Sequence, residues 1–383
     1  MNEVLEGLRE LFAQPGPFAT VYLDATRSTQ FGGREVRLRW AQLRGVLREQ
    51  GADERTLQAI DAATDSRGSA GRHGRVLVAT DGKILYDEYL PAPPLRPGAL
   101  WGALPDLMPY LSQRLRRGPE LAHVVALVDH AGVDIEAVSV LGDGSAESVQ
   151  GSRQYPLHKT AAGEWSERHF QNRVDNTIEF NARESAAVVA SLARRVDAEL
   201  VIVAGDPRSA ASVREHVRSL LPPSVDVTEV SAGGRADGAS EQLLRMAVHD
   251  QLWRRVWRTR RDVLARLQQD LGRGAYAVAG LDGVVGALQQ AQVDTIVLSD
   301  EPSSMLQAWI GPEPLQIATS ARALRDLGVD SPQETRLDAA LVRAVVGSGA
   351  GLMITPGGHD YVQDGIAALL RYATAQSTTA ATR

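Results

Sequence analysis

The sequence predicts a multidomain protein of the α/β and α+β classes, built on mixed sheets. Residues 199–205 form a near-continuous apolar run, as in strands that are buried on both faces. Two pairs of strand-like segments are joined by tight-turn residues, one at Asp81-Gly82 and one at residues 130–132. After residue 274, helical and strand-like segments alternate, which is typical of a small α/β layer domain.

Length and composition set the broad class. A chain of 383 residues exceeds the roughly 250 residues at which single cores stop growing, so two or three domains are expected. The absence of cysteine excludes disulfides, thiolate nucleophiles and cysteine metal sites, and fits a reducing cytosol. The N-terminus is acidic, and no apolar run approaches about 18 residues, so neither export nor membrane association is expected. A net charge of -6 argues against RNA binding by the whole surface but permits a local basic patch.

The first predicted domain covers residues 1–119. Its expected elements are a strand, two helices, a hairpin and a further helix, at residues 18–24, 34–48, 54–64, 75–86 and 101–116. The Arg-Gly-Pro sequence at 117–119 marks a boundary.

The middle domain is predicted at residues 120–272 and the third at 273–374, with a disordered tail at 375–383. The middle domain opens with a hairpin and continues as strand, helix, strand and helix, at residues 123–140, 199–205, 209–221, 225–230 and 240–271. Two helices and two strands are expected in the third domain, at 280–288, 337–346, 293–299 and 351–355. The order of the middle elements predicts a hairpin joined to βαβ units in one mixed sheet.

A polar loop and a long helix, together residues 158–181, separate the hairpin from these units. The helix carries both signs of charge, and only Phe170, Val174 and Ile178 supply an apolar stripe. That stripe is narrower than the stripe of roughly 100° on an ordinary core helix. We therefore expect the helix to project from its domain and to carry the loop outward.

The domain order and the C-terminal residues resemble a known superfamily. The segment Gly365-Ile-Ala-Ala-Leu-Leu-Arg-Tyr372 is similar to a Gly-Ile-Gly-Gly-Ile-Leu-Arg-Tyr type ending, and Ala287-Leu288 with residues 293–298 matches the preceding helix and strand. This pattern is found in the archaeal and eukaryotic class-1 release factor and Pelota superfamily. The chain most resembles its bacterial branch, which includes the ribosome hibernation factor Balon and proteins grouped with Vms/ANKZF-type peptidyl-tRNA hydrolases. The resemblance implies a decoding-site-type first domain, a middle loop directed at the peptidyl-transferase centre, and a ribosomal-protein-like third domain.

The chain departs from the release factors at their catalytic signature. Release factors carry Gly-Gly-Gln before the long helix, and alignment on His169-Phe170 places Gly163-Glu164-Trp165 at that position. A carboxylate and an indole cannot reproduce a flexible Gly-Gly backbone and an amide side chain. The only candidate for a catalytic residue is Gln171, which lies inside the predicted helix with its backbone already committed.

The loop and the helix start are predicted to contact RNA. The candidate residues are His158, Lys159, Gly163, Glu164, Trp165, Arg168, His169 and Gln171. An indole in so polar a segment favours a stacking contact, and histidine can both stack and donate to phosphate. Metal or proton-transfer chemistry and a solvated loop without a task are the alternatives. No His-Glu-x-x-His or other ligand-grade spacing supports the former.

A second candidate RNA contact lies in the first domain. Residues 66–75 place Arg67, Arg72, His73 and Arg75 among glycines, which let backbone approach a polyanion while arginine neutralises phosphate. A flexible surface connection with incidental charge is the alternative. Another arginine-containing loop, residues 27–34, is expected near this one.

The segment 253–261 has two tryptophans at i, i+4 and five arginines. It fits either an RNA-binding stripe with interleaved aromatics or a structural helix with Trp253, Val256, Trp257 and Leu264 buried. We favour the structural interpretation. No Walker A or nucleophile-elbow sequence occurs, so no cofactor and no metal are expected.

These observations lead to one main hypothesis and two alternatives. The main one is a noncatalytic cytoplasmic translation factor that binds rRNA at the ribosomal A site, in ribosome hibernation or stress protection. The resemblance implies elongation factor Tu, or a related GTPase, as a partner of the third domain. The first alternative is a Vms/ANKZF-type peptidyl-tRNA hydrolase acting in ribosome rescue. The second is a protein-interaction module without RNA.

Overall fold

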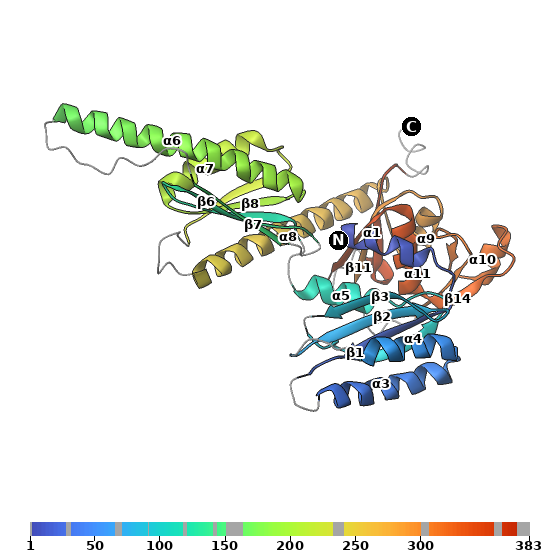
Figure 1. Ribbon diagram of the computed structural model, residues 1–383. Helices are drawn as coiled ribbons and strands as arrows, with labels where there is room; N and C mark the ends of the chain where they lie inside the picture. The colour runs from blue at the N-terminus through green and yellow to red at the C-terminus, as the bar shows by residue number, and fades with distance from the viewer. Residues whose placement is uncertain are drawn as a thin grey trace, which may run out of the picture. The chain divides into compact units, whose positions relative to one another are not determined.

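The computed structural model describes residues 2–27, 32–65, 71–90, 92–117, 121–140, 144–150, 164–232, 241–299, 306–355 and 362–373. Along residues 164–178 it describes the course of the helix and not the side chains. The chain forms two compact units, one from Met1–Arg117 with Leu264–Arg383 and one from Gly118–Val263. Residues of the first and third predicted domains therefore share unit 1, and unit 2 covers the predicted middle domain as far as Val263. Figure 1 shows the elements of both units.

The N-terminal part of unit 1 is an antiparallel sheet with strand order β3-β2-β1-β4. Its strands are β1 (Phe18–Asp24), β2 (Gly74–Thr80), β3 (Lys83–Leu90) and β4 (Gly98–Gly102). The helices are α3 (Gly32–Glu49), α4 (Glu54–Asp65) and α5 (Met108–Arg117). Asp81 and Gly82 have φ angles of 45° and 75°, so the predicted tight turn between β2 and β3 is confirmed.

Alternation along β1 sends side chains to two different layers. Ala19, Val21 and Leu23 join the core beneath α3 and α4. Tyr22 points to the other face, where its hydroxyl donates to the carbonyl of Asp106 at 2.7 Å. Both faces of the sheet are therefore covered, which explains why every residue of β2 is buried.

Unit 2 is a five-stranded mixed sheet with order β7-β6-β5-β8-β9. Its strands are β5 (His123–Val128), β6 (Gly132–Val138), β7 (Gly144–Gln150), β8 (Leu200–Gly205) and β9 (Asp226–Val230). The first three run antiparallel as a meander, and β5, β8 and β9 run parallel. The predicted hairpin joined to βαβ units is confirmed, and β7 extends the hairpin by a strand that sequence patterning did not indicate.

Three helices cover the two faces of this sheet. α6 (Glu164–Arg195) and α7 (Pro207–Leu220) pack on one face, and α8 (Glu241–Arg273) packs its first half on the other. At the end of β8, Gly205 has a φ of 116°, and a Cβ there would lie 2.0 Å from the Val128 carbonyl oxygen. Only glycine allows β8 to leave the sheet so close to β5.

The C-terminal part of unit 1 contains a sheet of order β10-β16-β11-β15 and a smaller sheet of order β13-β12-β14. The strands of the larger sheet are β10 (Ala277–Ala279), β11 (Val293–Ser299), β15 (Gly351–Thr355) and β16 (Ile366–Leu370). The smaller sheet comprises β12 (Gln307–Ile310), β13 (Ile317–Ala318) and β14 (Gln333–Arg336). The helices here are α9 (Leu281–Gln289), α10 (Ala321–Asp326), α11 (Leu337–Ser348) and the short η1 (Gln363–Gly365).

Helix α11 ties the two parts of unit 1 together. It is buried on almost every side, from Leu337 to Val346. From the N-terminal part of unit 1 it contacts α5 and the two opening helices, α1 (Asn2–Gly7) and α2 (Arg9–Phe12). A mostly apolar helix packs in a core, and the charged side chains of α11, Asp338 and Arg343, are hydrogen-bonded. Its burial accounts for the N- and C-terminal parts forming one unit.

Two expectations about local structure are wrong. Residues 98–102 form β4 where a helix was predicted from Trp101, because this segment pairs with β1 in a register that sets Trp101 opposite Ala19. Trp257 is 54% exposed, although it was expected to be buried. The buried position of this part of α8 is Leu252, and five residues at 100° each place Trp257 roughly 140° around the helix from it.

Two further findings bear on the sequence predictions. No helix among the described residues is long and apolar enough to cross a membrane. The tail predicted at 375–383 lies outside the described residues.

Candidate nucleic-acid interface

Two arginine-containing segments of the first domain lie side by side at the C-terminal end of β1. The Arg27 amide donates to the Gly71 carbonyl at 2.8 Å, and the Gly71 amide donates back at 3.2 Å. One step closer to the sheet, the Ala25 amide donates to the His73 carbonyl at 2.9 Å. Gly71 has a φ of 121°, which a residue with a side chain adopts only under strain. The expected proximity of the two loops is thereby confirmed.

Helix α3 begins against the same bridge. A Cβ on Gly32 would lie 2.7 Å from the Arg27 Cα, so the helix start packs directly on that backbone. The Arg39 guanidinium donates to the Asp24 carbonyl at 3.1 Å and fixes the second turn of α3 to the end of β1. The first turns of α3 therefore stand next to the Arg27–Gly71 bridge.

This arrangement gathers four arginines at one end of the sheet, which we call the basic end: Arg27, Arg34, Arg37 and Arg72. Arg34, Arg37 and Arg72 are exposed. Within the described part of the chain, no carboxylate forms an ion pair with any of these three, and Glu35 lies instead 3.6 Å from Arg39. Sequence reasoning did not include Arg37, and the signal for it was its position one helical turn after Arg34.

Arg75 corrects the prediction for this segment. Only 4% of the residue is exposed, because it lies on the central strand β2. Its Nε and Nη2 atoms donate to the two carboxylate oxygens of Asp87 at 2.7 and 2.6 Å, and Nη1 donates to the Ala63 carbonyl at 2.8 Å. Tyr89 lies under the guanidinium, 4.8 Å away. Arg75 is therefore committed to joining β2, β3 and α4 and has no surface to offer to RNA.

The other predicted residues of this segment have different outcomes. Arg67 lies outside the described residues. His73 is partly buried, and its backbone carbonyl takes part in the bridge region.

The predicted loop of the middle domain lies largely outside the described residues, including His158, Lys159 and Gly163. α6 begins at Glu164. Trp165, Arg168, His169 and Gln171 follow within the helix, and the structure describes their backbone only. Their role in RNA binding stays a prediction.

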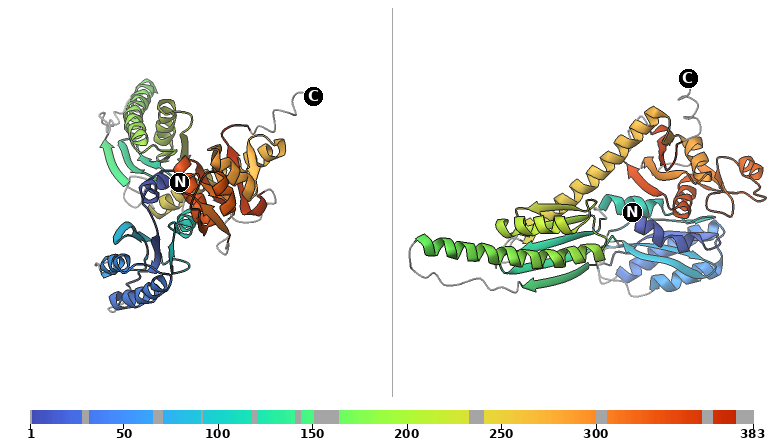
Figure 2. Two further views of the ribbon diagram at one scale, coloured as in Figure 1. Left: turned by 90° about the vertical axis from the view of Figure 1, so that its right-hand side faces the viewer. Right: turned by 90° about the horizontal axis from the view of Figure 1, so that it is seen from above.

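α6 divides into two halves that differ in packing. In its C-terminal half, small and β-branched side chains are buried against the sheet of unit 2: Ala182, Ala186, Val189, Ala190 and Ala193. Its N-terminal half runs on beyond the edge of that sheet, as both Figure 1 and the right panel of Figure 2 show. The predicted projection of the helix from its domain is confirmed.

A cluster of polar contacts holds α6 to α7 near the point where α6 leaves the sheet. The Glu179 carboxylate accepts from Ser212 Oγ and lies against His216 Nε2, each at 2.8 Å, and it accepts from Arg183 at 3.1 Å. The hydrogen bonds from Ser212 and His216 lower the Glu179 pKa. Ser212 donates to Glu179 and not to His216, so the cluster is an anchor and not a nucleophile–base pair.

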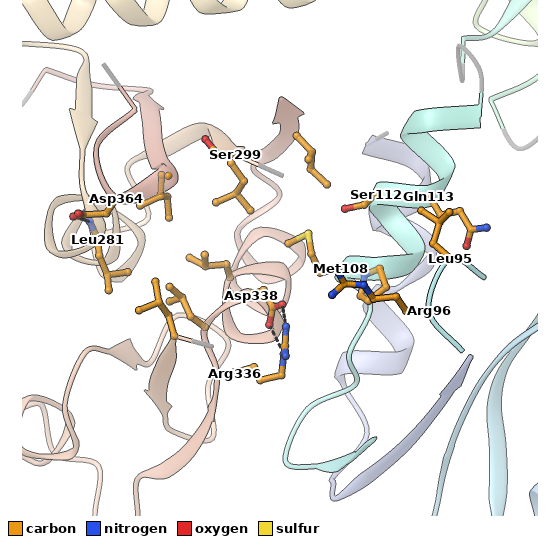
Figure 3. Close-up of a pocket in the computed structure, with 18 of the residues that line it drawn as sticks. Leu95, Arg96, Met108, Ser112, Gln113, Leu281, Ser299, Arg336, Asp338 and Asp364 are labelled. Atoms are coloured by element: carbon orange, nitrogen blue, oxygen red, sulfur yellow. Dashed lines mark hydrogen bonds and ion pairs between the residues drawn. The ribbon is translucent and has the colours of Figure 1, made fainter. Parts of the chain in front are cut away.

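Unit 1 also contains a cavity of about 640 Å³ between its N- and C-terminal parts (Figure 3). One side presents Leu95, Arg96 and Met108, and the other presents mainly apolar side chains of β11, α11 and β15. On the wall, Arg336 Nε donates to Asp338 Oδ1 at 3.0 Å. The described lining has neither histidine nor cysteine, and its carboxylates are Asp338, which is paired with Arg336, and Asp364.

Asp106 lies close to this cavity and carries an unusual carboxyl group. Burial, and next the charge of Asp338, raise its pKa to about 6, whereas Arg336 acts in the opposite direction. One of its oxygens is buried and has no hydrogen-bond partner among the described residues. The group therefore costs stability when it is ionised.

The chain is similar in sequence to known proteins. The model of "Bacterial archaeo-eukaryotic release factor family 2" matches residues 122–273. The uncharacterized protein Rv2629 of Mycobacterium tuberculosis (strain ATCC 25618 / H37Rv) is 30% identical over 373 residues, 96% of each chain. The chain belongs to the bacterial Pelota and release-factor-like family. The Pelota homologue of Hyperthermus butylicus is 29% identical over 238 residues, 58% of this chain and 60% of that protein.

Solved structures of the wider superfamily also align with the chain. Archaeoglobus fulgidus Pelota aligns with a TM-score of 0.33 and 15% identity, over 97% of this chain and 92% of that one. An archaeal Pelota, in a model of ribosome-bound Pelota and ABCE1, gives a TM-score of 0.42 and 13% identity, over 98% and 95%. The mixed α/β architecture of this protein is established by its own sheets, described above.

Proposed function

We propose that this protein is a ribosome-binding translation factor that occupies the A site and does not hydrolyse peptidyl-tRNA. Family membership supports the assignment to translation. The expected setting is ribosome hibernation or stress protection in the cytoplasm. The single observation that carries RNA binding is the basic end, where the fold brings separate arginine segments onto one surface.

The basic end has the properties that phosphate binding requires. Guanidinium groups present forked donors that match phosphate oxygens. Contacts to the phosphate backbone fix a protein's register on a nucleic acid without reading the base sequence. Arg34, Arg37 and Arg72 are exposed and lack a described carboxylate partner, so binding phosphate breaks no ion pair at these residues. In the family arrangement this domain faces the decoding site, which is lined by rRNA phosphates.

The start of α6 supports a noncatalytic role. Trp165 stands where the release factors have glutamine, and it lies in the first turn of a helix instead of in a flexible Gly-Gly segment. Gln171 is the eighth residue of α6, beyond the four amides that a helix leaves unbonded at its N-terminus. Its backbone amide is therefore engaged within the helix and cannot orient water as the catalytic glutamine does.

The C-terminal part of unit 1 is the proposed contact for a delivery GTPase, elongation factor Tu or a relative. This part forms its own sheets with exposed apolar residues, among them Leu306 and Leu327. Family resemblance motivates the choice of partner. Co-sedimentation of ribosomes with and without elongation factor Tu and GTP measures whether the GTPase increases occupancy.

Ribosome pelleting at about 0.15 M salt tests the role of the basic end. The variant Arg34→Gln/Arg37→Gln/Arg72→Gln removes three exposed cations, and we expect binding to weaken by about tenfold or more with a shallower salt dependence. The matched control is Arg9→Gln/Arg48→Gln/Arg55→Gln, which removes three exposed cations elsewhere in the same unit. Equal binding by both variants would remove the basic end from the interface.

Hydrolysis remains the second candidate function, because the family includes hydrolases and Gln171 is present. The test is release of labelled peptide from ribosome-bound peptidyl-tRNA, compared with a control without protein. We expect no release above the control. Release that is lost in Gln171→Ala and retained in Trp165→Ala would establish the hydrolase.

A further inference from the structure

Unit 2 contains a second concentration of arginines, made of residues that belong to neither predicted RNA contact. A polar depression of about 260 Å³ runs along β9, the edge strand of the sheet. We call it the arginine groove and define it by the five guanidinium groups that line it: Arg214 and Arg218 of α7, and Arg254, Arg255 and Arg258 of α8. Two carboxylates, Asp226 and Glu229, also line it. Two helices on opposite faces of the sheet thus direct cations to one edge.

Each arginine has at least one partner that holds it in place, and Arg255 also donates to the Thr259 hydroxyl at 2.6 Å. The pairs are Arg214 with Glu229 at 3.5 Å, Arg218 with the Val227 carbonyl at 2.8 Å, Arg254 with Asp250 at 2.8 Å, Arg255 with Glu199 at 3.5 Å, and Arg258 with Asp226 at 2.8 Å. A guanidinium has five N–H donors, so one or two partners leave most of them available. The Arg255 Nε is buried and has no partner in the described structure. The groove is therefore ordered and still has donors to spare.

The carboxylates do not close the groove to a polyanion. Partly exposed ion pairs contribute only about 0–1 kcal/mol each, so a phosphate can compete for the same guanidinium. Arg and phosphate form a bidentate pair with charge-assisted hydrogen bonds, which are about twice as strong as neutral ones. Pre-positioned arginines also lose less side-chain entropy when a ligand binds.

An exposed aromatic side chain, Trp257, lies on the same stretch of α8 as three of the groove arginines. Trp257 sits between groove residues on α8, three positions after Arg254 and one before Arg258. It is 54% exposed, its ring centroid lies 6.4 Å from that of Trp253, and the Arg260 guanidinium is 5.5 Å above it. An exposed indole next to cations is a platform on which a nucleobase can stack. The indole favours a nucleic acid over a simple anion as the ligand, because a site for a simple anion needs no aromatic ring.

We propose that the arginine groove and Trp257 bind a single-stranded segment of RNA, with backbone phosphates on the arginines and a base stacked on Trp257. The inference deepens the proposed function and rests on it, because it names a second RNA contact, on the unit that does not carry the basic end. Single-stranded RNA is favoured over a duplex because only unpaired bases offer a free face to an aromatic ring. An acidic peptide is the competing occupant, since it would use the arginines but gain little from Trp257.

Binding of a labelled oligouridine of about 12 nucleotides to the full chain tests the proposal, measured by fluorescence anisotropy over a salt series. We expect Arg214→Gln/Arg254→Gln/Arg258→Gln to lower the slope of log K against log salt by about 2, at roughly 0.7 per lost phosphate contact. Trp257→Ala should weaken binding about tenfold at unchanged slope, because stacking releases no counterions.

Arg254 and Arg245 form a matched pair for the control. Both lie on α8, their side chains are 64% and 70% exposed, and each pairs with an acid four residues earlier. Arg254→Gln should weaken binding several-fold and Arg245→Gln should leave it unchanged. Equal affinities for these two variants, or a triple variant that binds like the parent, would overturn the proposal. So would tighter binding of a polyglutamate peptide than of the oligouridine.

Ribosome pelleting of the same variants separates this inference from the proposed function. If the parent and the groove variants pellet equally well with ribosomes, the proposed ribosome-binding function is supported and the groove is not one of the ribosome contacts. Conversely, groove-dependent binding of oligouridine by a chain that does not pellet with ribosomes keeps the RNA site and removes the A-site role. If the parent binds oligouridine and pellets with ribosomes, and the groove variants do neither, the result supports both proposals.

Discussion

The basic end and the rim of the sheet next to it use the same kind of residue in opposite ways. Arg72 is exposed and has no described carboxylate partner, whereas Arg75, three residues later, is buried with a bidentate bond to Asp87. The difference arises because Arg75 belongs to β2, whose neighbour β3 presents Asp87. A guanidinium with its hydrogen bonds filled by protein contributes to the fold, and one that is left in water is available to a ligand. The arginines of the arginine groove combine the two properties, because each has a partner in the protein and each is still accessible to a ligand.

The largest expected effect separates these two arginines. Arg75→Ala removes one partner of a mostly buried pair together with the bond to the Ala63 carbonyl, and we expect it to lower the free energy of unfolding by about 3–5 kcal/mol. Arg72→Ala should change it by less than about 0.5 kcal/mol. Urea denaturation of both variants measures this contrast. Similar losses for the two would show that Arg72 also has a structural role and would break the comparison.

The predicted tip of the middle domain provides a second contrast, between stacking and charge. Trp165→Ala should weaken ribosome binding by about 1–3 kcal/mol, the value of one lost base stack, and leave its salt dependence unchanged. The basic-end variant, by comparison, should flatten the salt dependence. Binding affinities at several salt concentrations distinguish the two. Parent-like binding by Trp165→Ala would show that this residue makes no contact.

Asp106 is the reverse of Arg75, a buried charge that lacks a full set of partners. Its folded-state pKa of about 6 lies above the value near 4 in the unfolded chain, so the folded state binds the proton more tightly. The native protein therefore loses stability as the pH rises from about 4 through about 6. Asp106→Asn should raise the free energy of unfolding at pH 8 by about 1–3 kcal/mol and give no gain near pH 4.

Thermal unfolding of parent and Asp106→Asn at the two pH values checks this. An equal shift at both would mean that the substitution acts through packing, and a loss at pH 8 would mean that the carboxylate is stabilised in a way this geometry does not provide.

Local chemistry explains which parts of the fold could be predicted. The Asp81-Gly82 turn depends on its own two residues, and the run that became β8 carries its signal in its own apolar composition, so both were predicted. The strand at residues 98–102 was missed because it exists by pairing with β1, about eighty residues earlier in the chain. No residue near Trp101 in the sequence indicates that this segment pairs with β1.

The candidate site shows the same limit. Sequence composition indicated an arginine-rich contact and the nearness of its two loops, but not which arginines face water. Arg75 was misassigned because its burial depends on Asp87, on a different strand. Trp257 was placed in the core because two tryptophans at helical spacing usually pack inward, whereas the sheet beneath α8 is contacted by Leu252 instead.

Sedimentation of ribosomes that carry peptidyl-tRNA measures binding and hydrolysis in the same sample. Ribosomes carrying labelled peptidyl-tRNA are incubated with the full chain and sedimented, and the pellet is assayed for protein while the supernatant is assayed for peptide. We expect protein in the pellet, less of it for Arg34→Gln/Arg37→Gln/Arg72→Gln, and no peptide released beyond the protein-free control. Peptide in the supernatant, or a pellet without the protein, would contradict it.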